Sequence, residues 1–361
     1  MKVKIGELTK IKTGKLDANA ASEDGQYPFF TCSKEPLRIS TYSYDCECVL
    51  VAGNGDLNVK YYNGKFDAYQ RTYIIEDNGS GKLYMPYLYY LMEGYIEELR
   101  KQAVGGVIKY IKLGNLTDAL IELPSIDEQK SIVEILVKAK GILEKRNDEL
   151  NALDDLIKAR FVEMFGEPRI NPNKYPTKMI KDTCIVITGN TPSRKVDEYY
   201  GDAIEWIKTD NIVSGLLYPT VASESLSDSG KAVGRTVDAG AILMACIAGS
   251  VASIGRVCIT DREVAFNQQI NAIVPKEYDV RFLHALLQIS KDYLVEDINM
   301  ALKGIMSKSK LEEKEFIVPV MEEQVGFAEF VEQVDKSKVA VQKALDETQL
   351  LFDSLMQEYF G

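Results

Sequence analysis

The sequence predicts an α+β protein in which two mixed α/β domains are separated by two long helices that pair as an antiparallel coiled coil. One observation is a short phrase that opens a long amphipathic stretch and occurs twice, at positions 121 and 316. Another is the series of short, alternating apolar stretches before each occurrence. A chain of 361 residues is also too long for one ordinary core. We therefore expect a tandem repeat with pseudo-twofold symmetry.

The repeat divides the chain into four segments. We expect a first domain over 1–120, a helix over 121–168, a second domain over 169–318 and a second helix over 319–361. The net charge of −11 is concentrated in the helical segments, which carry −4 and −6, whereas the domains carry 0 and −1. A near-neutral domain can still gather basic side chains on one face, so the overall acidity does not exclude nucleic acid as a partner.

Composition points to a cytoplasmic protein without a membrane partner. The most apolar run, at 241–249, is too short to cross a bilayer, and we interpret it as a buried strand. The N-terminus lacks the apolar region of a signal peptide. The six cysteines include no CxxC pair and the chain has a single histidine, so we expect free thiols and no metal site.

The repeated phrase is IELPSIDEQ at 121–129 and FIVPVMEEQ at 316–324. After each copy, seam positions alternate at spacings of four and three, which is typical of a coiled coil. The first seam consists of Ile132, Leu136, Ala139, Leu143, Arg146, Leu150, Leu153, Ile157, Arg160 and Met164. The second consists of Phe327, Val331, Val334, Lys338, Val341, Leu345, Thr348, Phe352, Leu355 and Tyr359. Two unrelated amphipathic helices are the alternative, which the ungapped match disfavours.

The ends of the first helix carry their own signals. Ser125 and Glu128 have the spacing of a capping box, which the second copy loses because Val320 replaces the serine. Gly166 and Pro168 end the first helix. A helix of about 40 residues would be about 60 Å long. For spacer-helix packing and partner docking we select Glu128, Gln129, Leu136, Leu150, Ile157, Glu323, Gln324, Val331, Leu345 and Phe352.

The segments before the two helices also repeat. Residues 4–14 align with residues 179–189, and both segments end in Thr-Gly. Residues 48–76 and 241–275 each read as strand, Gly-rich turn, strand, turn and strand. Each domain is therefore expected to combine helices with many short strands.

This order, with PxxEQ opening each long helix and a Thr-Gly turn early in each domain, resembles the specificity subunit of type I restriction-modification enzymes. The resemblance covers essentially the whole chain. It implies that each domain is a target-recognition domain for one half of a split site in double-stranded DNA. It also implies that the helices fix the gap and dock two methyltransferase subunits, which restriction and translocase subunits join later.

The resemblance further implies that the chain has no catalytic role. S-adenosylmethionine, and ATP with Mg, would belong to the partner subunits. The sequence agrees, because it lacks the adjacent proline pair of an adenine-methylating loop, a full P-loop spacing and a metal-ligand cluster. Two alternatives remain: a scaffold with two interaction modules that does not bind DNA, and an enzyme of an unfamiliar kind. Salt-dependent affinity for duplex DNA would exclude the first, and cofactor binding by the isolated chain would favour the second.

In the second domain, the turn TGNTPSRK at 188–195 combines small residues with two basic ones. Its amides and hydroxyls suit a phosphate group. The candidates are Thr191, Ser193, Arg194 and Lys195. A solvated surface turn explains the same residues equally well.

Other candidates of the second domain would read bases. Arg256 follows a Gly-rich stretch and can pair with guanine or phosphate. Asn267, Gln268 and Gln269 carry amides that can pair with adenine. A tight strand turn and buried amides that satisfy loop backbone are the alternatives.

In the first domain, residues 58–71 interleave basic and aromatic side chains, as in a surface that contacts phosphates and bases. The candidates are Lys60, Tyr61, Tyr62, Lys65, Gln70 and Arg71, and an ordinary β-hairpin is the alternative. The basic stretches before the helices add phosphate candidates Lys109, Lys112, Lys303, Lys308 and Lys310.

Overall fold

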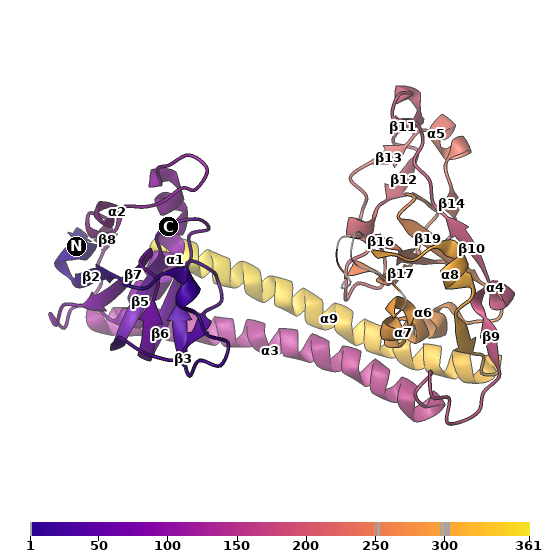
Figure 1. Ribbon diagram of the computed structural model, residues 1–361, viewed down its shortest axis with the longest axis horizontal. Helices are drawn as coiled ribbons and strands as arrows, with labels where there is room; N and C mark the ends of the chain where they lie inside the picture. The colour runs from indigo at the N-terminus through magenta and orange to yellow at the C-terminus, as the bar shows by residue number, and fades with distance from the viewer. Residues whose placement is uncertain (1, 249, 251–252, 297, 299–303) are drawn as a thin grey trace. The chain divides into compact units, whose positions relative to one another are not determined.

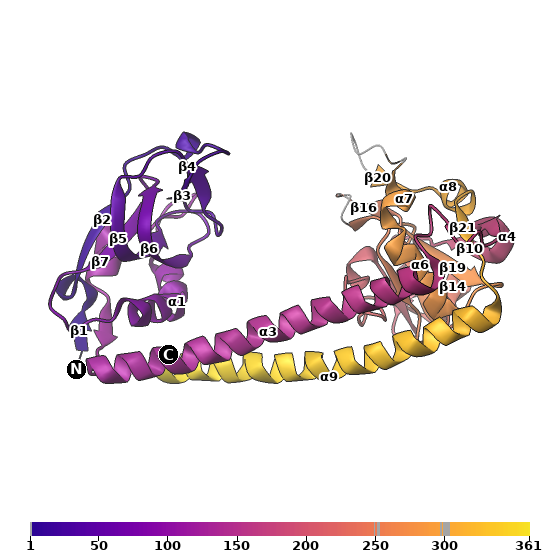
Figure 2. The same ribbon diagram turned by 90° about the horizontal axis from the view of Figure 1, so that it is seen from below.

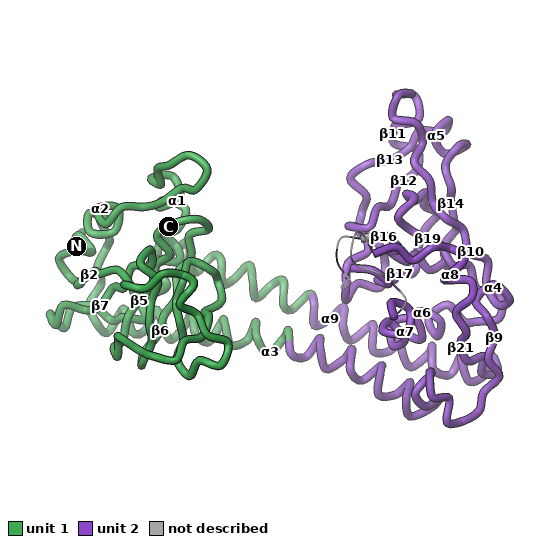
Figure 3. Tube along the Cα trace, in the orientation of Figure 1, with its two compact units in different colours: residues 1–147, 343–361 green, residues 148–342 purple. Residues whose placement is uncertain are grey.

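The computed structural model divides the chain into two compact units (Figure 3). Unit 1 comprises residues 1–147 and 343–361, and unit 2 comprises residues 148–342. Each unit therefore holds one globular domain and part of each long helix. The structure describes the chain except for residues 1, 249, 251–252, 297 and 299–303.

The β structure of unit 1 is formed by β1 (Lys2–Lys4), β2 (Thr9–Thr13), β3 (Tyr27–Phe30), β4 (Leu37–Ile39), β5 (Tyr44–Ala52), β6 (Val59–Ala68), β7 (Thr72–Asp77) and β8 (Leu120–Glu122). The main sheet has the order β2-β7-β5-β6-β3-β4 (Figure 1). Its neighbours are antiparallel except β3 and β6, which are parallel. β1 and β8 form a separate antiparallel pair.

Alternate residues of β5 face opposite sides of this sheet, as the pleat requires. Val49 and Val51 join the core that lies under α1 (Met85–Gln102). Leu50 faces a second cluster together with Phe66. The short helix α2 (Leu113–Thr117) follows α1 and leads into β8.

The β structure of unit 2 is formed by β9 (Thr177–Met179), β10 (Cys184–Thr188), β11 (Tyr200–Gly201), β12 (Ile204–Ile207), β13 (Ser225–Leu226), β14 (Thr236–Val237), β15 (Ile242–Ala245), β16 (Ile247–Ala248), β17 (Val257–Ile259), β18 (Val264–Phe266), β19 (Ile270–Pro275), β20 (Gly304–Ile305) and β21 (Glu315–Ile317). One sheet has the order β10-β19-β15-β17 and another the order β11-β13-β12-β18-β14. β15 is fully buried, as we expected for the most apolar run.

The helices within the second domain are α4 (Ile180–Thr183), α5 (Asp228–Val233), α6 (Val280–Ile289), α7 (Lys291–Val295) and α8 (Lys308–Glu312). Asp279 caps α6 by accepting hydrogen bonds from the amides of Arg281 (2.8 Å) and Phe282 (3.1 Å). Phe282 then lies in the main core of unit 2, beside β15 and β19.

The long helices are α3 (Ile126–Phe165) and α9 (Met321–Phe360), each of 40 residues. Within unit 1 the beginning of α3 and the end of α9 contribute to one core, and within unit 2 the end of α3 and the beginning of α9 contribute to another. The two helices are therefore antiparallel within each unit (Figure 2). Every position of both predicted seams is buried or half-buried.

The polar seam positions make specific contacts. The guanidinium of Arg160 lies 5.8 Å from the ring centroid of Phe330. Lys338 forms an ion pair with Asp154, and the hydroxyl of Thr348 donates to a carbonyl of the preceding helical turn. Arg160 and Lys338 therefore make contacts from one long helix to the other, as register-setting residues can, whereas Thr348 bonds within its own helix.

The first long helix begins and ends as the sequence indicated. The amide of Ser125 donates to the Glu128 carboxylate (2.8 Å), while the amide of Glu128 donates to the Ser125 hydroxyl (3.4 Å). The Ser125 hydroxyl also donates to the Glu128 carboxylate (2.7 Å), and this bond, together with the one from the Ser125 amide, lowers the pKa of Glu128 because both stabilise its charged form. Gly166 follows the helix with a φ of 78°, the left-handed conformation that favours glycine.

The two units repeat one plan, so the predicted tandem α+β fold is confirmed. The order β2-β7-β5-β6 of unit 1 corresponds to β10-β19-β15-β17 of unit 2. The six cysteines are free thiols. Within the described residues, every helix is too short or too polar to cross a membrane.

Candidate nucleic-acid interface

The Thr-Gly turn lies at the same place in both units. A Cβ atom on Gly14 would lie 2.1 Å from the carbonyl oxygen of Ala68, and a Cβ atom on Gly189 would lie 2.1 Å from that of Asn267. Only glycine fits so close an approach of two backbones. The turn therefore pins the segment after the first strand of each sheet against the turn at 69–71 or at 267–269.

In unit 2 this pinned segment carries the predicted phosphate candidates. The hydroxyl of Thr191 donates to the side chain of Gln268. The hydroxyl of Ser193 accepts from the amide of Lys195 (3.4 Å), and Lys195 is exposed. Thr191 and Ser193 thus order the turn, while Arg194 and Lys195 supply its positive charge.

Arg194 is held by two aromatic rings that we did not select from the sequence. Its guanidinium lies 4.4 Å from the ring centroid of Tyr200 and 5.1 Å from that of Trp206. It also forms an ion pair of 2.5 Å with Glu224. Such stacking fixes a guanidinium in one orientation while part of it stays exposed.

Glu224 is shared by two cations. Lys208 forms a second ion pair with it and lies 5.2 Å from the ring centroid of Trp206. Hydrogen bonds from Lys208 and Arg194 lower the pKa of Glu224. The cluster therefore keeps a net positive charge next to the rings of Tyr200 and Trp206. This arrangement suits a phosphate group or a guanine. In the sequence, the single tryptophan stands two residues before Lys208, and this aromatic-basic pair was the available signal for the cluster.

The predicted adenine-reading amides are largely engaged inside their own turn. Asn267 is buried, its side chain accepts from the amide of Gln269 (3.0 Å) and it donates to the Gln269 side chain (3.2 Å). Gln268 is exposed and bound to Thr191. Among these amides, Gln268 is therefore the one at the surface.

Arg256 serves as a bridge between loops. Its guanidinium donates to the carbonyls of Ser253 (3.3 Å) and Thr209 (3.2 Å). The side chain is half-buried, so the structure accounts for it by loop packing. Its role as a DNA contact stays a prediction.

In unit 1, β6 places the candidate side chains on opposite faces of the sheet. The hydroxyl of Tyr61 donates to the Glu47 carboxylate (2.7 Å), and burial together with this bond raises the pKa of Tyr61. The amine of Lys65 lies 4.6 Å from the ring centroid of Tyr42. These residues form an exposed face with both aromatic and charged character.

Tyr62 and Lys60 lie on the other face. The ring of Tyr62 lies 5.1 Å from Phe30 and 5.7 Å from Phe66, so it belongs to the core. Lys60 donates to the Asn58 side chain, and burial lowers the pKa of its amine. Core packing accounts for Tyr62 without a DNA contact, as the hairpin alternative had it.

The remaining candidates of unit 1 lie in its turns. Gln70 donates to the Asp17 carboxylate (2.7 Å), which ties the turn at 69–71 to the segment after Gly14. Arg71, Lys109 and Lys112 are exposed. Together with Lys65 on β6, these three cations are the basic candidates that unit 1 presents to solvent.

The lysines selected from the basic stretch before the second long helix make only local contacts or lie outside the described residues. Lys308 lies 3.6 Å from Glu312 in α8. Lys310 is exposed, and its amide donates to the hydroxyl of Ser307. Lys303 lies outside the residues that the structure describes.

The two glutamines of the repeated phrase are buried clamps. The side chain of Gln129 accepts from the amide of Tyr84 (2.8 Å) and donates to the carbonyls of Lys82 (2.8 Å) and Pro124 (3.0 Å). Tyr84 is the N-cap residue of α1. Gln129 therefore joins the start of α3 to the start of α1.

Gln324 makes the same bonds in unit 2. It accepts from the amide of Asp279 (2.9 Å) and donates to the carbonyls of Glu277 (3.2 Å) and Pro319 (2.8 Å). Each partner stands 195 residues after its counterpart in unit 1. The repeated phrase thus marks the joint between a long helix and its domain, which we did not foresee from the sequence.

The other spacer candidates vary in exposure. Leu136 and Val331 are buried, whereas Leu150, Ile157, Leu345 and Phe352 are half-buried. Glu323 accepts a hydrogen bond from the Tyr175 hydroxyl (3.2 Å). Docking of a partner by these residues stays a prediction.

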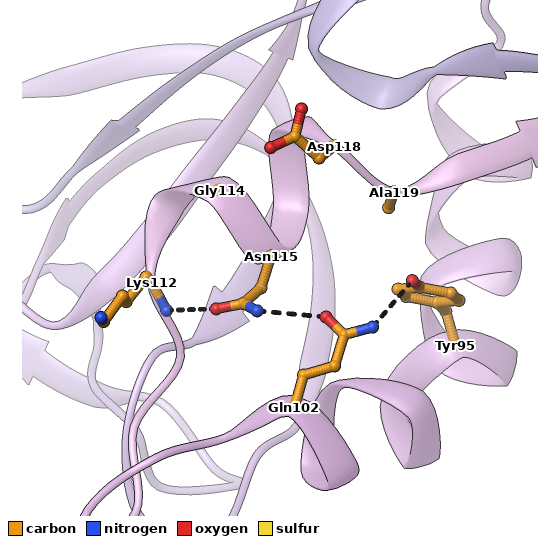
Figure 4. Close-up of a pocket in the computed structure, with 7 residues that line it drawn as sticks. All are labelled: Tyr95, Gln102, Lys112, Gly114, Asn115, Asp118 and Ala119. Atoms are coloured by element: carbon orange, nitrogen blue, oxygen red, sulfur yellow. Dashed lines mark hydrogen bonds between the residues drawn. The ribbon is translucent and has the colours of Figure 1, made fainter.

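A shallow pocket of about 370 Å³ lies between α1 and α2 (Figure 4). Asn115 accepts from the amide of Lys112 (2.7 Å) and donates to the side chain of Gln102 (3.1 Å), which donates to the Tyr95 hydroxyl (3.4 Å). This chain of bonds fastens the end of α1 to α2.

Across the described part of the chain, no cluster of His, Cys, Asp and Glu suits a metal ion.

A family model described as the type I restriction modification DNA specificity domain matches residues 1–152 and 172–348, which together make up most of the chain. This match agrees with the resemblance that the sequence motifs indicated.

Two curated relatives are specificity subunits of type I restriction enzymes. The EcoDI specificity subunit of Escherichia coli is 43% identical over 156 residues, which cover 43% of this chain and 34% of that protein. The MjaIX specificity subunit of Methanocaldococcus jannaschii is 31% identical over 182 residues, 48% of this chain and 41% of that protein. The match thus spans less than half the length of these relatives.

Solved structures share the fold. A crystal structure of the type I restriction-modification S subunit from M. genitalium aligns with a TM-score of 0.61 and 15% identity, covering 100% of this chain and 96% of that chain. A chain from a structural study of assembly and conformational transition in the type I system aligns with a TM-score of 0.54 and 15% identity, covering 100% and 97%.

Proposed function

The chain belongs to the family of type I restriction modification DNA specificity domains, and from this premise we propose that it gives a type I restriction-modification complex its DNA sequence specificity. In this role each globular domain reads one half of a bipartite site in double-stranded DNA. The chain itself carries no catalytic step. The proposal places it in the cytoplasm.

One observation carries this proposal: the same scaffold occurs twice and displays different side chains. The amide of Thr72 donates to the carbonyl of Tyr69 (2.8 Å), and the amide of Ile270 donates in the same way to Asn267 (3.1 Å). The turns closed by these bonds read Tyr-Gln-Arg in unit 1 and Asn-Gln-Gln in unit 2. Unit 1 exposes Gln70 and Arg71 in this turn, whereas unit 2 exposes Gln268 and keeps Asn267 buried. One backbone that presents different donors and acceptors suits two unlike half-sites.

The long helices take two further roles in the proposal. Their length sets the gap between the half-sites, and their acidic outer faces dock two methyltransferase subunits. Restriction and translocase subunits join this core. S-adenosylmethionine, and ATP with Mg, are then held by the partner subunits, where the chemistry takes place.

The decisive experiment compares methylated-adenine maps of the source genome with this gene intact and deleted. Loss of one split motif on deletion is the expected result. An unchanged map, with the gene expressed and its methyltransferase present, would contradict the proposal.

Two substitutions sharpen this experiment and act as controls for each other. Arg194→Ala in unit 2 should relax the sequence of one half of the motif, whereas Arg71→Ala in unit 1 should affect the other half. Each loses a contact worth about 1–3 kcal/mol if the side chain reads a base. A change in both halves by one substitution would argue against separate readers.

A further inference from the structure

A loop of residues 103–112 joins α1 to α2 in unit 1 (Figure 1). Several of its aliphatic side chains are exposed. Val107 is fully exposed and Ile108 is 62% exposed. Val104 and Tyr110, at the base of the loop, are 45% and 40% exposed. Adjoining exposed apolar side chains indicate a binding surface, because burying them against a partner is favourable whereas exposing them to water is not.

The loop is closed by its own backbone. The amide of Val104 donates to the carbonyl of Tyr110 (3.0 Å), and the amide of Tyr110 donates back to Val104 (2.9 Å). Gly105 has a φ of 127°, and a Cβ atom there would lie 2.6 Å from the carbonyl oxygen of Ile108. The loop tip is therefore held in one conformation, and its apolar side chains are exposed in that ordered conformation.

The base of the loop is anchored to the domain. The amide of Ile111 donates to the carbonyl of Gly53 (2.9 Å), and Ile111 is buried in the core. The bond from Asn115 to Gln102 ties the two flanks together (Figure 4). A tip held in this way can enter a partner with little loss of conformational freedom.

The charge around the tip points to a polyanion. Residues 103–112 include two basic side chains, Lys109 and Lys112, and no acidic one. The neighbouring turn adds the exposed Arg71, whose carbonyl accepts from the amide of Gly53 (2.8 Å). Duplex DNA offers the matching combination of outer phosphates and apolar base surfaces.

We propose that Val107 and Ile108 make an apolar contact with the bases of duplex DNA while Lys109 and Lys112 hold the adjacent phosphates. This inference rests on the proposed function and adds a base-contacting element to unit 1. The apolar surface has two sources in a duplex. One is the thymine methyl group in the major groove, and the other is the face of a base step opened by an aliphatic wedge.

The test uses the complete chain in complex with its methyltransferase and a duplex that carries the mapped methylation motif. The double substitution Val107→Ser with Ile108→Ser should weaken binding about tenfold, or about 1.4 kcal/mol. The salt dependence of the affinity should not change, because no charge is lost. Lys109→Ala, in contrast, should lower the slope of log affinity against log salt by about one.

The control pair is Leu120→Ser with Val221→Ser. These aliphatic side chains are 60% and 79% exposed and lie outside the loop. Their replacement should leave the affinity unchanged. An equal loss in the control pair would show a general effect of removing surface aliphatic groups and would overturn the proposal.

Two DNA probes separate the sources of apolar surface. Replacing thymine by uracil removes only the methyl groups, and an equal loss of affinity for the wild-type complex would assign the contact to them. The fluorescent base 2-aminopurine, placed at positions other than the methylated adenine, would brighten on binding if a step is opened. Either response should occur in one half-site and disappear in the double variant.

The proposal fails if the double variant binds the duplex as the wild type does, or if neither probe responds. It also fails if the double variant binds DNA normally but no longer assembles with the methyltransferase, which would make the loop a protein-docking element. If the wild-type complex does not prefer the motif to an unrelated duplex, the proposed function itself falls and the inference falls with it.

Discussion

Replacing Gln129 with alanine should destabilise unit 1 more than any exposed glutamine substitution. The amide of this buried side chain satisfies three backbone groups, at Tyr84, Lys82 and Pro124. A buried polar group without a partner costs about 1–3 kcal/mol. Because water entering the vacated space would satisfy some of these groups, we expect a total loss of roughly 3–5 kcal/mol.

Urea unfolding followed by far-UV circular dichroism measures this loss. The matched control is Gln349→Ala, since Gln349 lies exposed on α9 and donates only to Asp353 (2.8 Å). A surface change of that kind should stay within about 0.5 kcal/mol. Gln324→Ala repeats the test in unit 2. It should lower the urea concentration at which the fluorescence of Trp206 changes, since this single tryptophan is buried in unit 2.

A further substitution separates hydrogen bonding from shape. Gln129→Glu keeps the volume, but a carboxylate cannot donate to the carbonyls of Lys82 and Pro124. We expect it to lose at least as much stability as Gln129→Ala. If Gln129→Ala behaved like Gln349→Ala, or if Gln129→Glu were as stable as the wild type, the clamp would not be what joins α3 to α1.

Three other substitutions test the domains and the first long helix. Burial lowers the pKa of His284 to about 4, so the folded state holds this imidazole neutral while the unfolded chain protonates it near pH 6.5. Its stabilising contribution is present above pH 6.5 and is lost as pH falls toward 4. Between pH 7 and pH 5 the wild type should therefore lose roughly 2 kcal/mol more unfolding free energy than His284→Gln, measured by urea titration, and equal losses would refute this. Gly189→Ala should prevent the turn from closing, because its Cβ atom would overlap the Asn267 carbonyl, and should lower the thermal midpoint of unit 2. Gly141→Ala, whose Cβ atom meets nothing within 4 Å, should instead stabilise its helix by about 0.5–1 kcal/mol, and a loss there would contradict the reasoning.

The long helices were predictable because their signals are local. A four-three alternation is visible in one stretch of sequence, and the capping bonds of Ser125 and Glu128 join residues three apart. The seam prediction held even where polar residues interrupt it, since Lys338 found an ion-pair partner in Asp154. Spacing alone identified these positions.

The candidate site was less predictable because its geometry depends on distant pairings. Tyr62 faces the core because β6 pairs with β5 in one particular register, and a shift of one residue would reverse its face. Arg256 donates to the carbonyl of Thr209, which lies 47 residues earlier. The rings that hold Arg194 come from β11 and β12, and periodicity carries no information about such partners.

The shared residues at the ends of the long helices serve the same structural joints. Phe165 and Phe360, which are 195 residues apart, end the two long helices. Phe165 lies 5.0 Å from the ring of Phe282, and Phe360 lies 5.3 Å from Tyr87, the residue at the equivalent place in α1. Gln129 and Gln324, like Phe165 and Phe360, are therefore shared where a long helix meets a domain, whereas the exposed turns at 69–71 and 267–269 differ in sequence. If the turns read DNA, substitutions at a joint should reduce methylation of the motif without changing its sequence, whereas substitutions in a turn should change the sequence.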